Sequence, residues 1–188
     1  MPAEVHILQA IRALAGPELD RFFLLSHYLG TLWLCLVLVL VMVLWHWVRH
    51  ERREANVWLA VGLSTYVLQE GLKRLFERPR PELWPRLYTW PPPPAPETFS
   101  FPSGHALASA TFYPLLAYVL TRERPPQVRR AALALGVLAA LWIGFGRLYL
   151  GVHWPSDVLA GWLLGAVQSA YAIHRLTRAR PLGESSVR

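Results

Sequence analysis

The stretch YLGTLWLCLVLVLVMVLWHWV, residues 28–48, decides the fold class of this chain. Its 21 residues are apolar apart from Thr31 and His46, with Gly30 near the start. At a rise of about 1.5 Å per residue, a helix of this length crosses the hydrocarbon core of a membrane, which is about 30 Å thick. The stretch is therefore typical of a transmembrane helix.

Four further apolar blocks follow the first, over residues 57–72, 105–120, 131–149 and 158–173. Several are shorter than about 20 residues, so each alone would also suit a buried core helix. Five blocks in 188 residues leave too little polar chain to cover them in water. The sequence predicts an all-α, polytopic transmembrane helical bundle of five to six spans, with residues 1–188 forming one domain.

The composition agrees with this fold class and excludes several others. Hydrophobic residues make up 54% of the chain and charged residues 16%, whereas disordered chains are poor in apolar residues and rich in charge. A single cysteine, Cys35, excludes a disulfide scaffold. The net charge of +7 could indicate nucleic-acid binding, but the basic residues cluster between the apolar blocks, as in membrane loops. We therefore expect no nucleic-acid partner.

The segments outside the blocks carry further predictions. Residues 1–20 are expected to contain an amphipathic helix that lies in the membrane interface. Residues 78–103 are rich in proline and are expected to form an extended outer loop, and residues 174–188 a cytoplasmic tail. The apolar face of the first helix is predicted from the spacing of Ile7, Leu8, Ile11 and Leu14.

The arginines in the segments between the apolar blocks predict how the protein is oriented in the membrane. Eleven of the nineteen basic residues lie after the first block, between the third and fourth, and in the tail. These segments share one side, because an even number of spans separates them, and the positive-inside rule places that side in the cytoplasm. We therefore expect an integral protein of the plasma or inner membrane. His27 and His46 are interpreted as interfacial histidines.

Three polar clusters lie at the ends of the apolar blocks. One follows the second block, one opens the third, and one joins the fourth to the fifth. Counting the spans places all three on the same side, whichever way the protein is oriented, so clusters that are distant in sequence can meet in one site. The positive-inside rule makes this the outer side. The candidate site residues are Lys73, Arg80, Ser103, Gly104, His105, Arg147, His153 and Asp157.

Several of these residues suit the binding of a phosphate. Lys73, Arg80 and Arg147 supply three positive charges, and the planar fork of arginine matches a tetrahedral oxyanion. Ser103 precedes an apolar helix, as an N-cap residue does. The backbone N–H groups that follow it would be donors at a helix N-terminus, where phosphate binds readily. Gly104 would also let an anion approach the backbone closely.

The remaining residues suit phosphoryl transfer. His153 lies just before the fifth block and Asp157 one turn into it, so the carboxylate can hold one imidazole nitrogen and leave the other as nucleophile. His105 could protonate the leaving oxygen. No cluster of carboxylates or cysteines in the sequence suits a metal. The residues favour transfer through a phosphohistidine, without a metal or another cofactor.

Each residue also has a structural interpretation when it is taken alone. Lys73 and Arg80 would suit a basic belt at the end of a span, and Ser103 and Asp157 would suit helix caps. The two histidines would suit buried, hydrogen-bonded positions. The placement of all these residues on one side of the membrane favours a shared phosphate-binding and catalytic site over separate structural roles.

The three clusters match the motifs of a known family. The sequence resembles the type 2 phosphatidic acid phosphatases, which are integral-membrane lipid phosphate phosphatases related to glucose-6-phosphatases and vanadium haloperoxidases. The motif Lys-x6-Arg-Pro matches residues 73–81, and Pro-Ser-Gly-His matches residues 102–105. The motif Ser-Arg-x5-His-x3-Asp matches residues 146–157, except that Gly146 replaces the serine. The resemblance covers about residues 10–173.

The resemblance implies a helical bundle, often of six spans, whose site lies near the outer membrane surface. By position, His153 would be the nucleophile that forms phosphohistidine, Asp157 its orienting partner and His105 the general acid. Replacement of the serine by Gly146 would remove one hydrogen-bonding group. The phosphate would be bound by Lys73, Arg80, Ser103, Gly104 and Arg147.

The resemblance implies a phosphatase of lipid phosphates or diphosphates and leaves alternatives open. The same site could transfer phosphate between lipids, or hydrolyse a soluble sugar-type phosphate, because the motifs contact the phosphate and not its tail. A non-catalytic lipid carrier or scaffold would be expected to lack part of the histidine–aspartate triad, which is complete here. Phosphatidic acid, phosphatidylglycerol phosphate and undecaprenyl diphosphate all remain possible substrates, and the oligomeric state is not predicted.

Overall fold

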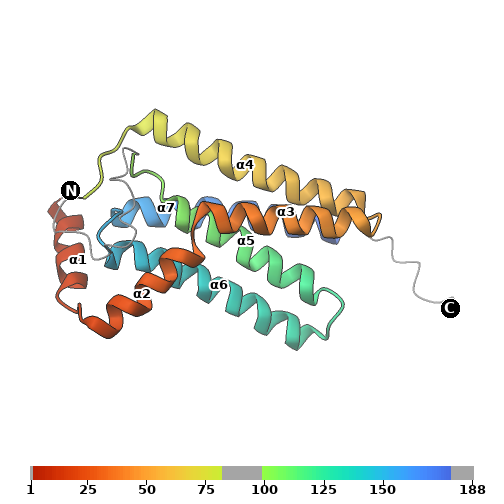
Figure 1. Ribbon diagram of the computed structural model, residues 1–188, viewed down its shortest axis with the longest axis horizontal. Coiled ribbons are helices and arrows are strands. Elements are labelled where there is room, and N and C mark those ends of the chain that lie inside the picture. Colours follow the sequence, from red (N-terminus) through yellow and green to blue (C-terminus); the bar gives the residue numbers. More distant parts are fainter. Residues whose placement is uncertain (1, 82–98, 179–188) are drawn as a thin grey trace.

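The long helices of the chain form a bundle and run along one axis, and the first helix lies across one end of it (Figure 1). The computed structural model describes residues 2–81 and 99–178, and in these residues it contains helices and no strand. The helices are α1 (Pro2–Arg12), α2 (Pro17–Leu29), α3 (Leu32–Val48), α4 (Arg52–Phe76), α5 (Gly104–Thr121), α6 (Pro126–Tyr149) and α7 (Pro155–Thr177).

Helix α5 lies at the centre of the bundle and packs most extensively on α6 and α7. Small residues permit this approach. A Cβ at Gly165 would lie 2.5 Å from the carbonyl oxygen of Leu107, and one at Gly161 would lie 2.7 Å from that of Ser103. Glycines four residues apart let two helix backbones come close, which is a common packing mode of membrane helices.

Large apolar side chains are exposed along the flanks of the long helices. Soluble proteins rarely expose apolar surface on this scale, whereas lipid-facing helices do. By length and hydropathy, α6 could cross a membrane, and α2 with α3, which are bent by 44°, would make a second span if they form one. The number of spans stays a prediction. Examples of these exposed side chains are Leu40, Val41, Leu63, Val67, Leu138, Leu163 and Val167.

The first apolar block is not one continuous helix. Helix α2 ends at Leu29, and Thr31 caps the start of α3, where its Oγ1 accepts a hydrogen bond from the backbone N–H of Leu34 at 3.4 Å. The break directs α2 across α6 rather than along the axis of α3 (Figure 1). The prediction of an unbroken helix over residues 28–48 was therefore wrong in this detail.

The predicted interfacial helix over residues 1–20 is two helices, α1 and the start of α2, separated by residues 13–16. Leu8 is fully buried and packs against Trp154 and Val158, whereas Leu14 is 68% exposed. Helix α1 therefore packs on α6 and α7, and it does not present the single apolar face that we expected. Whether it lies in the membrane interface stays a prediction.

The arginine-containing connections meet at one end of the bundle, on the right in Figure 1. Arg53 donates a hydrogen bond to the carbonyl oxygen of Arg175 at 3.2 Å, and Arg122 forms ion pairs with Glu51 and Glu54 at 3.8 Å and 3.5 Å. The three segments therefore share an end, as the count of spans predicts. The helix α7 continues into the predicted tail as far as Thr177. Most of the predicted outer loop, residues 82–98, and the tail residues 179–188 lie outside the described residues.

Candidate active site

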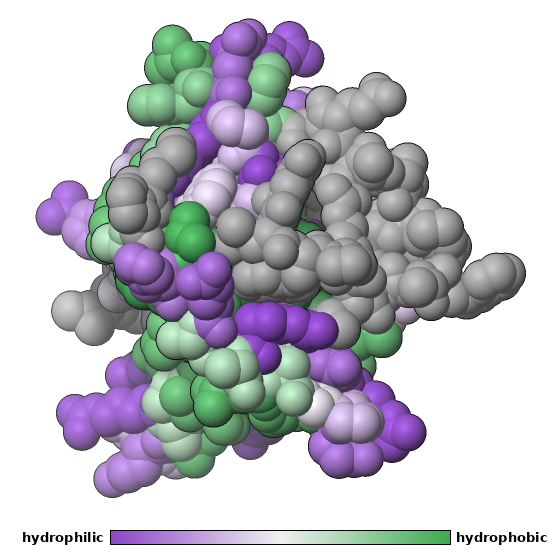
Figure 2. Space-filling view, turned by 90° about the vertical axis from the view of Figure 1, so that its left-hand side faces the viewer, coloured by the Kyte–Doolittle hydropathy of each residue, from purple (hydrophilic) through white to green (hydrophobic). Residues whose placement is uncertain are grey.

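The three predicted clusters lie together at the opposite end of the bundle, where α4 and α6 end and α5 and α7 begin. Figure 2 looks onto this end and shows hydrophilic residues gathered among hydrophobic ones. The first turns of α5 and α7 are joined directly, since the backbone N–H of Ser103 donates to the carbonyl oxygen of Asp157 at 3.0 Å. The topology therefore brings together residues that are far apart in the sequence.

Ser103 is the predicted N-cap of α5. It is fully buried, and its Oγ accepts a hydrogen bond from the backbone N–H of Ala106 at 3.5 Å. The position of Gly104 differs from the expectation. The space that a Cβ would need there is filled by the side-chain amide of Gln69, from α4. We expected the missing side chain at Gly104 to leave room for an anion. In the structure, the side chain of Gln69 lies in that space, close to the backbone of Gly104.

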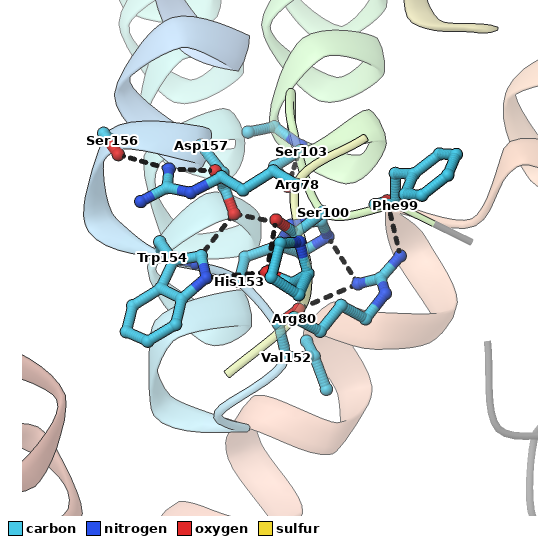
Figure 3. Close-up of polar contacts among 12 residues, drawn as sticks. Arg78, Arg80, Phe99, Ser100, Ser103, Val152, His153, Trp154, Ser156 and Asp157 are labelled. Carbon is cyan, nitrogen blue, oxygen red and sulfur yellow. Dashed lines mark hydrogen bonds and ion pairs between the residues drawn. The ribbon is translucent and has the colours of Figure 1, made fainter. Parts of the chain in front are cut away.

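His153 and Asp157 form the dyad that the sequence predicts (Figure 3). Asp157 is fully buried, and its Oδ2 lies 3.5 Å from Nδ1 of His153 and accepts a hydrogen bond from the backbone N–H of Trp154 at 2.9 Å. The carboxylate thus caps α7 and faces the imidazole at once. The separation of 3.5 Å is longer than a normal hydrogen bond, so the carboxylate faces the ring without a close bond to it.

Arg80 identifies the reactive nitrogen of His153. Its Nη1 lies 3.2 Å from Nε2 of His153 and donates to the carbonyl oxygen of Val152 at 2.8 Å. A guanidinium can only donate, so Nε2 must be the acceptor and the ring proton must be on Nδ1, facing Asp157. The lone pair of Nε2 therefore points to an arginine that suits an oxyanion, which is the arrangement that an attacking histidine needs.

The environment of His153 keeps its ring neutral. Burial of the ring lowers the pKa of His153 to about 3, and the charges of Arg80 and Arg147 add to the effect. Asp157 opposes the shift without cancelling it. A neutral imidazole retains the lone pair that nucleophilic attack requires.

This pKa predicts an unusual titration. An exposed histidine has a pKa of about 6.5 and is almost fully protonated at pH 5, whereas a ring with a pKa of about 3 stays neutral there. In ¹⁵N-histidine NMR spectra of the purified protein, we expect the ring of His153 to keep its neutral shifts between pH 7 and pH 5. Its signal is identified as the one that is missing from His153→Gln. Protonation of that ring with a midpoint near pH 6.5 would contradict the assignment.

Arg78 is a site residue that the motifs do not include. Its Nη1 lies 2.6 Å from Oδ1 of Asp157, and its Nη2 lies 2.7 Å from Oε2 of Glu4. The other oxygen of Glu4 accepts hydrogen bonds from the backbone N–H and the hydroxyl of Ser156, at 3.0 Å and 2.7 Å. The dyad carboxylate is therefore tied through Arg78 to helix α1 (Figure 3 shows Arg78, Ser156 and Asp157).

Arg147 and His105 meet through a third histidine. Arg147 is 3% exposed, and its Nη1 lies 2.8 Å from Nδ1 of His27. His105 Nε2 lies 3.2 Å from the carbonyl oxygen of His27, and the two rings stack with centroids 5.2 Å apart. His27, which is half-buried, therefore contacts two of the predicted site residues, a role that we did not expect. His46 is buried, and its Nδ1 bonds to Glu51 at 2.7 Å. Whether either histidine lies in the membrane interface stays a prediction.

Lys73 lies in the last turn of α4, and its Nζ is 3.6 Å from Oε1 of Glu70. The lysine is therefore at the predicted end of the bundle, with a carboxylate as its partner. Within residues 2–81 and 99–178, no group of three or more His, Cys, Asp or Glu side chains is arranged to hold a metal ion. The expectation of a site without a metal or cofactor stays a prediction.

A histidine with one ring nitrogen beside an arginine and the other facing a carboxylate suits nucleophilic attack on an anionic group such as a phosphate. Comparison with known proteins identifies the class of protein. The PAP2 superfamily matches residues 32–181, which is most of the chain, so the chain belongs to the PAP2 superfamily. The family resemblance that the motifs predict is thereby confirmed.

Two of its relatives are named as phosphatases. The chain is 30% identical over 166 residues to phosphatidylglycerophosphatase B of Bacillus subtilis, which covers 87% of this chain and 78% of that protein. It is 41% identical over 73 residues to an undecaprenyl-diphosphatase of Sulfolobus acidocaldarius, covering 39% of this chain and 32% of that one.

A solved relative agrees in fold. The crystal structure of a transmembrane PAP2 type phosphatidylglycerolphosphate phosphatase from Bacillus subtilis matches with a TM-score of 0.82 and 26% identity, and covers 96% of this chain and 88% of that one. The chain is thus an all-helical membrane protein, and its enzyme class is that of a phosphatase.

Proposed function

We propose that this protein is a metal-independent phosphatase of lipid phosphates or diphosphates that works through a phosphohistidine. The observation that carries the proposal is the orientation of His153, whose Nε2 lies 3.2 Å from Nη1 of Arg80 while its Nδ1 faces Asp157. The exposed apolar flanks of α3, α4, α6 and α7 support a substrate that arrives from the membrane.

In the first step, Nε2 of His153 attacks the phosphorus, and the bond from phosphorus to the leaving oxygen breaks. The positive charge that develops on the imidazole is stabilised by Asp157 through Nδ1. His105, protonated in the substrate complex, gives its Nδ1 proton to the leaving oxygen and keeps the Nε2 proton that bonds to the carbonyl oxygen of His27. The charge on the phosphoryl oxygens is balanced by Arg80, by the N-terminal amides of α5, and by Lys73 and Arg147.

In the second step, water attacks the phosphohistidine, and the bond from phosphorus to Nε2 breaks. His105, which lost its proton in the first step, takes the proton of the attacking water. Inorganic phosphate leaves, and both histidines return to their starting protonation states. The two half-reactions therefore use His105 as acid and then as base.

The site is proposed to face the outer side of the membrane. The support is its position opposite the arginine-containing end, where Arg53, Arg122 and Arg175 lie. Positively charged connections are retained in the cytoplasm, so the opposite end would meet the outer leaflet and its headgroups.

Phosphatidylglycerol phosphate is the first substrate to test, because a relative that shares most of the chain is a phosphatidylglycerophosphatase. Undecaprenyl diphosphate and phosphatidic acid complete the lipid panel, with glucose 6-phosphate as a soluble comparison. We expect phosphate release from at least one lipid in the presence of EDTA, measured on the purified protein. Loss of activity in EDTA would contradict metal independence, and release from the sugar phosphate alone would contradict a lipid substrate. Addition of a hydroxylated lipid distinguishes hydrolysis, which yields free phosphate, from transfer, which yields a new phospholipid.

A further inference from the structure

Helix α2 approaches α6 unusually closely beside the active site. A Cβ at Gly146 would collide with Oγ of Ser26 and would lie 3.2 Å from its Cβ. Ser26 is fully buried and its hydroxyl donates to the carbonyl oxygen of Phe23 at 2.6 Å, so it cannot simply turn out to solvent. The hydroxyl of Ser26, on α2, therefore fills the space that a side chain at position 146 of α6 would need. The family motif carries a serine at that position.

A second close approach lies one turn further along α2. A Cβ at Gly30 would lie 2.5 Å from Cγ2 of Ile143 and 2.7 Å from Cδ2 of His105. Gly30, which follows the last residue of α2, and Gly146 on α6 thus let the end of α2 lie directly on α6 and on the first turn of α5. This packing fixes the position of His27, which lies between Ser26 and Gly30.

His27 holds the guanidinium of Arg147. Arginine can only donate, so the contact of 2.8 Å requires that Nδ1 of His27 accepts and that its ring proton is on Nε2. Arg147 is buried, and a buried guanidinium needs acceptors for its donors. His27 supplies one from a helix that carries none of the family motifs.

His27 also orients His105 in two ways. Its carbonyl oxygen accepts a hydrogen bond from Nε2 of His105 at 3.2 Å, and its ring stacks on the ring of His105 with an interplanar angle of 16°. A stacked ring restricts rotation of its neighbour about χ2. One residue therefore contacts both a proposed phosphate-binding arginine and the proposed general acid.

We propose that His27 is a positioning residue of the active site, which holds Arg147 and His105 in place, and that the contact of Ser26 with Gly146 seats it there. The inference rests on the proposed function of the site. It assigns to α2 a role for which the three motifs give no signal.

Two substitutions separate the two side-chain contacts of His27. His27→Asn keeps an acceptor near the position of Nδ1 and loses the stacked ring, whereas His27→Phe keeps a ring and loses the acceptor. The backbone carbonyl is unchanged in both. We expect His27→Phe to raise the inhibition constant of inorganic phosphate and KM about tenfold or more, because a hydrogen bond to a charged group is lost. We expect His27→Asn to lower kcat severalfold and to leave phosphate inhibition close to that of the wild type.

The matched controls are His174→Phe and His174→Asn, since His174 is exposed at the far end of α7. They should behave as wild type. A structural role alone would reduce the amount of folded protein in both His27 variants and leave KM and phosphate inhibition unchanged, and that result would overturn the proposal.

The anion-binding part of the proposal can be measured without turnover. Inorganic phosphate should raise the Tm of the wild-type protein, and the rise should be smaller for His27→Phe than for His27→Asn. If the wild type hydrolyses none of the phosphate esters but this order holds, the proposed function fails and the role of His27 stands. Equal rises in Tm for both variants and the wild type would overturn the role of His27.

The seating of α2 is tested by exchanging the two residues. Gly146→Ser alone should lower Tm and raise the inhibition constant of phosphate, because the new side chain collides with Ser26. The double variant Ser26→Gly/Gly146→Ser should recover phosphate inhibition toward the wild-type value, a non-additive result expected only for residues in contact. Additive losses in the double variant would overturn the proposed seating.

Discussion

His153→Gln should abolish turnover, with kcat lowered by at least about 10⁴-fold on every substrate. Glutamine is similar in size and polar, but its amide nitrogen has no available lone pair and cannot attack phosphorus. The substitution removes Nε2 of His153, the atom that faces Arg80 at 3.2 Å. The folded bundle should survive, since the ring makes no hydrogen bond that a core element depends on.

The measurement is release of phosphate from lipid substrates, together with trapping of the labelled intermediate. A phosphohistidine is labile in acid and stable in base, unlike a phosphoserine or an acyl phosphate, so a rapid alkaline quench should retain label on the wild type and none on His153→Gln. His174→Gln is the matched control and should keep both activity and label. Undiminished turnover by His153→Gln would refute the mechanism.

His105→Gln should lower kcat about 10²- to 10⁴-fold on an alkyl phosphate, which is the usual contribution of a general acid. The loss should depend on the leaving group. An aryl phosphate such as p-nitrophenyl phosphate expels an oxygen that needs little protonation, so its first step should be nearly unaffected. The second step still needs a base for water, and the phosphoenzyme should accumulate.

The distinguishing readout is therefore a burst of nitrophenol followed by slow turnover, seen for His105→Gln and not for the wild type. The alkyl phosphate should show no burst with this variant. An equal loss on both leaving groups, without a burst, would show that His105 supports the site in some other way. The stack of His105 on His27 makes such a structural contribution measurable in the same experiment, as a change in Tm.

The general fold and the main site residues could be predicted because they depend on local patterns. Apolar blocks long enough to span a membrane indicate a helical bundle whatever their partners are. The count of spans then places the ends of the blocks, and motif spacing such as that of His153 and Asp157 determines which side chains meet at the start of a helix. These inferences need no knowledge of how one helix packs on another.

The details that the sequence did not predict all depend on packing between helices. The role of His27 arises only because α2 breaks away from α3 after Leu29 and lies on α6. Arg78 differs from its neighbouring arginines only because Asp157 and Glu4 are brought to it from α7 and α1. A carboxylate and a guanidinium that are about 75 or more residues apart carry no mark of their pairing in the linear chain.

Gly146 shows the division between sequence and structure most clearly. From the sequence it is a lost serine, and its only expected effect is one missing hydrogen-bonding group. In the folded chain the missing side chain is the space that Ser26 fills, and the helix that carries Ser26 brings His27 to Arg147. Local sequence patterns indicate which residues can take part in the reaction, because the spacing of residues along the chain determines where their side chains lie on a helix. Close packing decides which of them act together, because two helices can approach only where their side chains leave room.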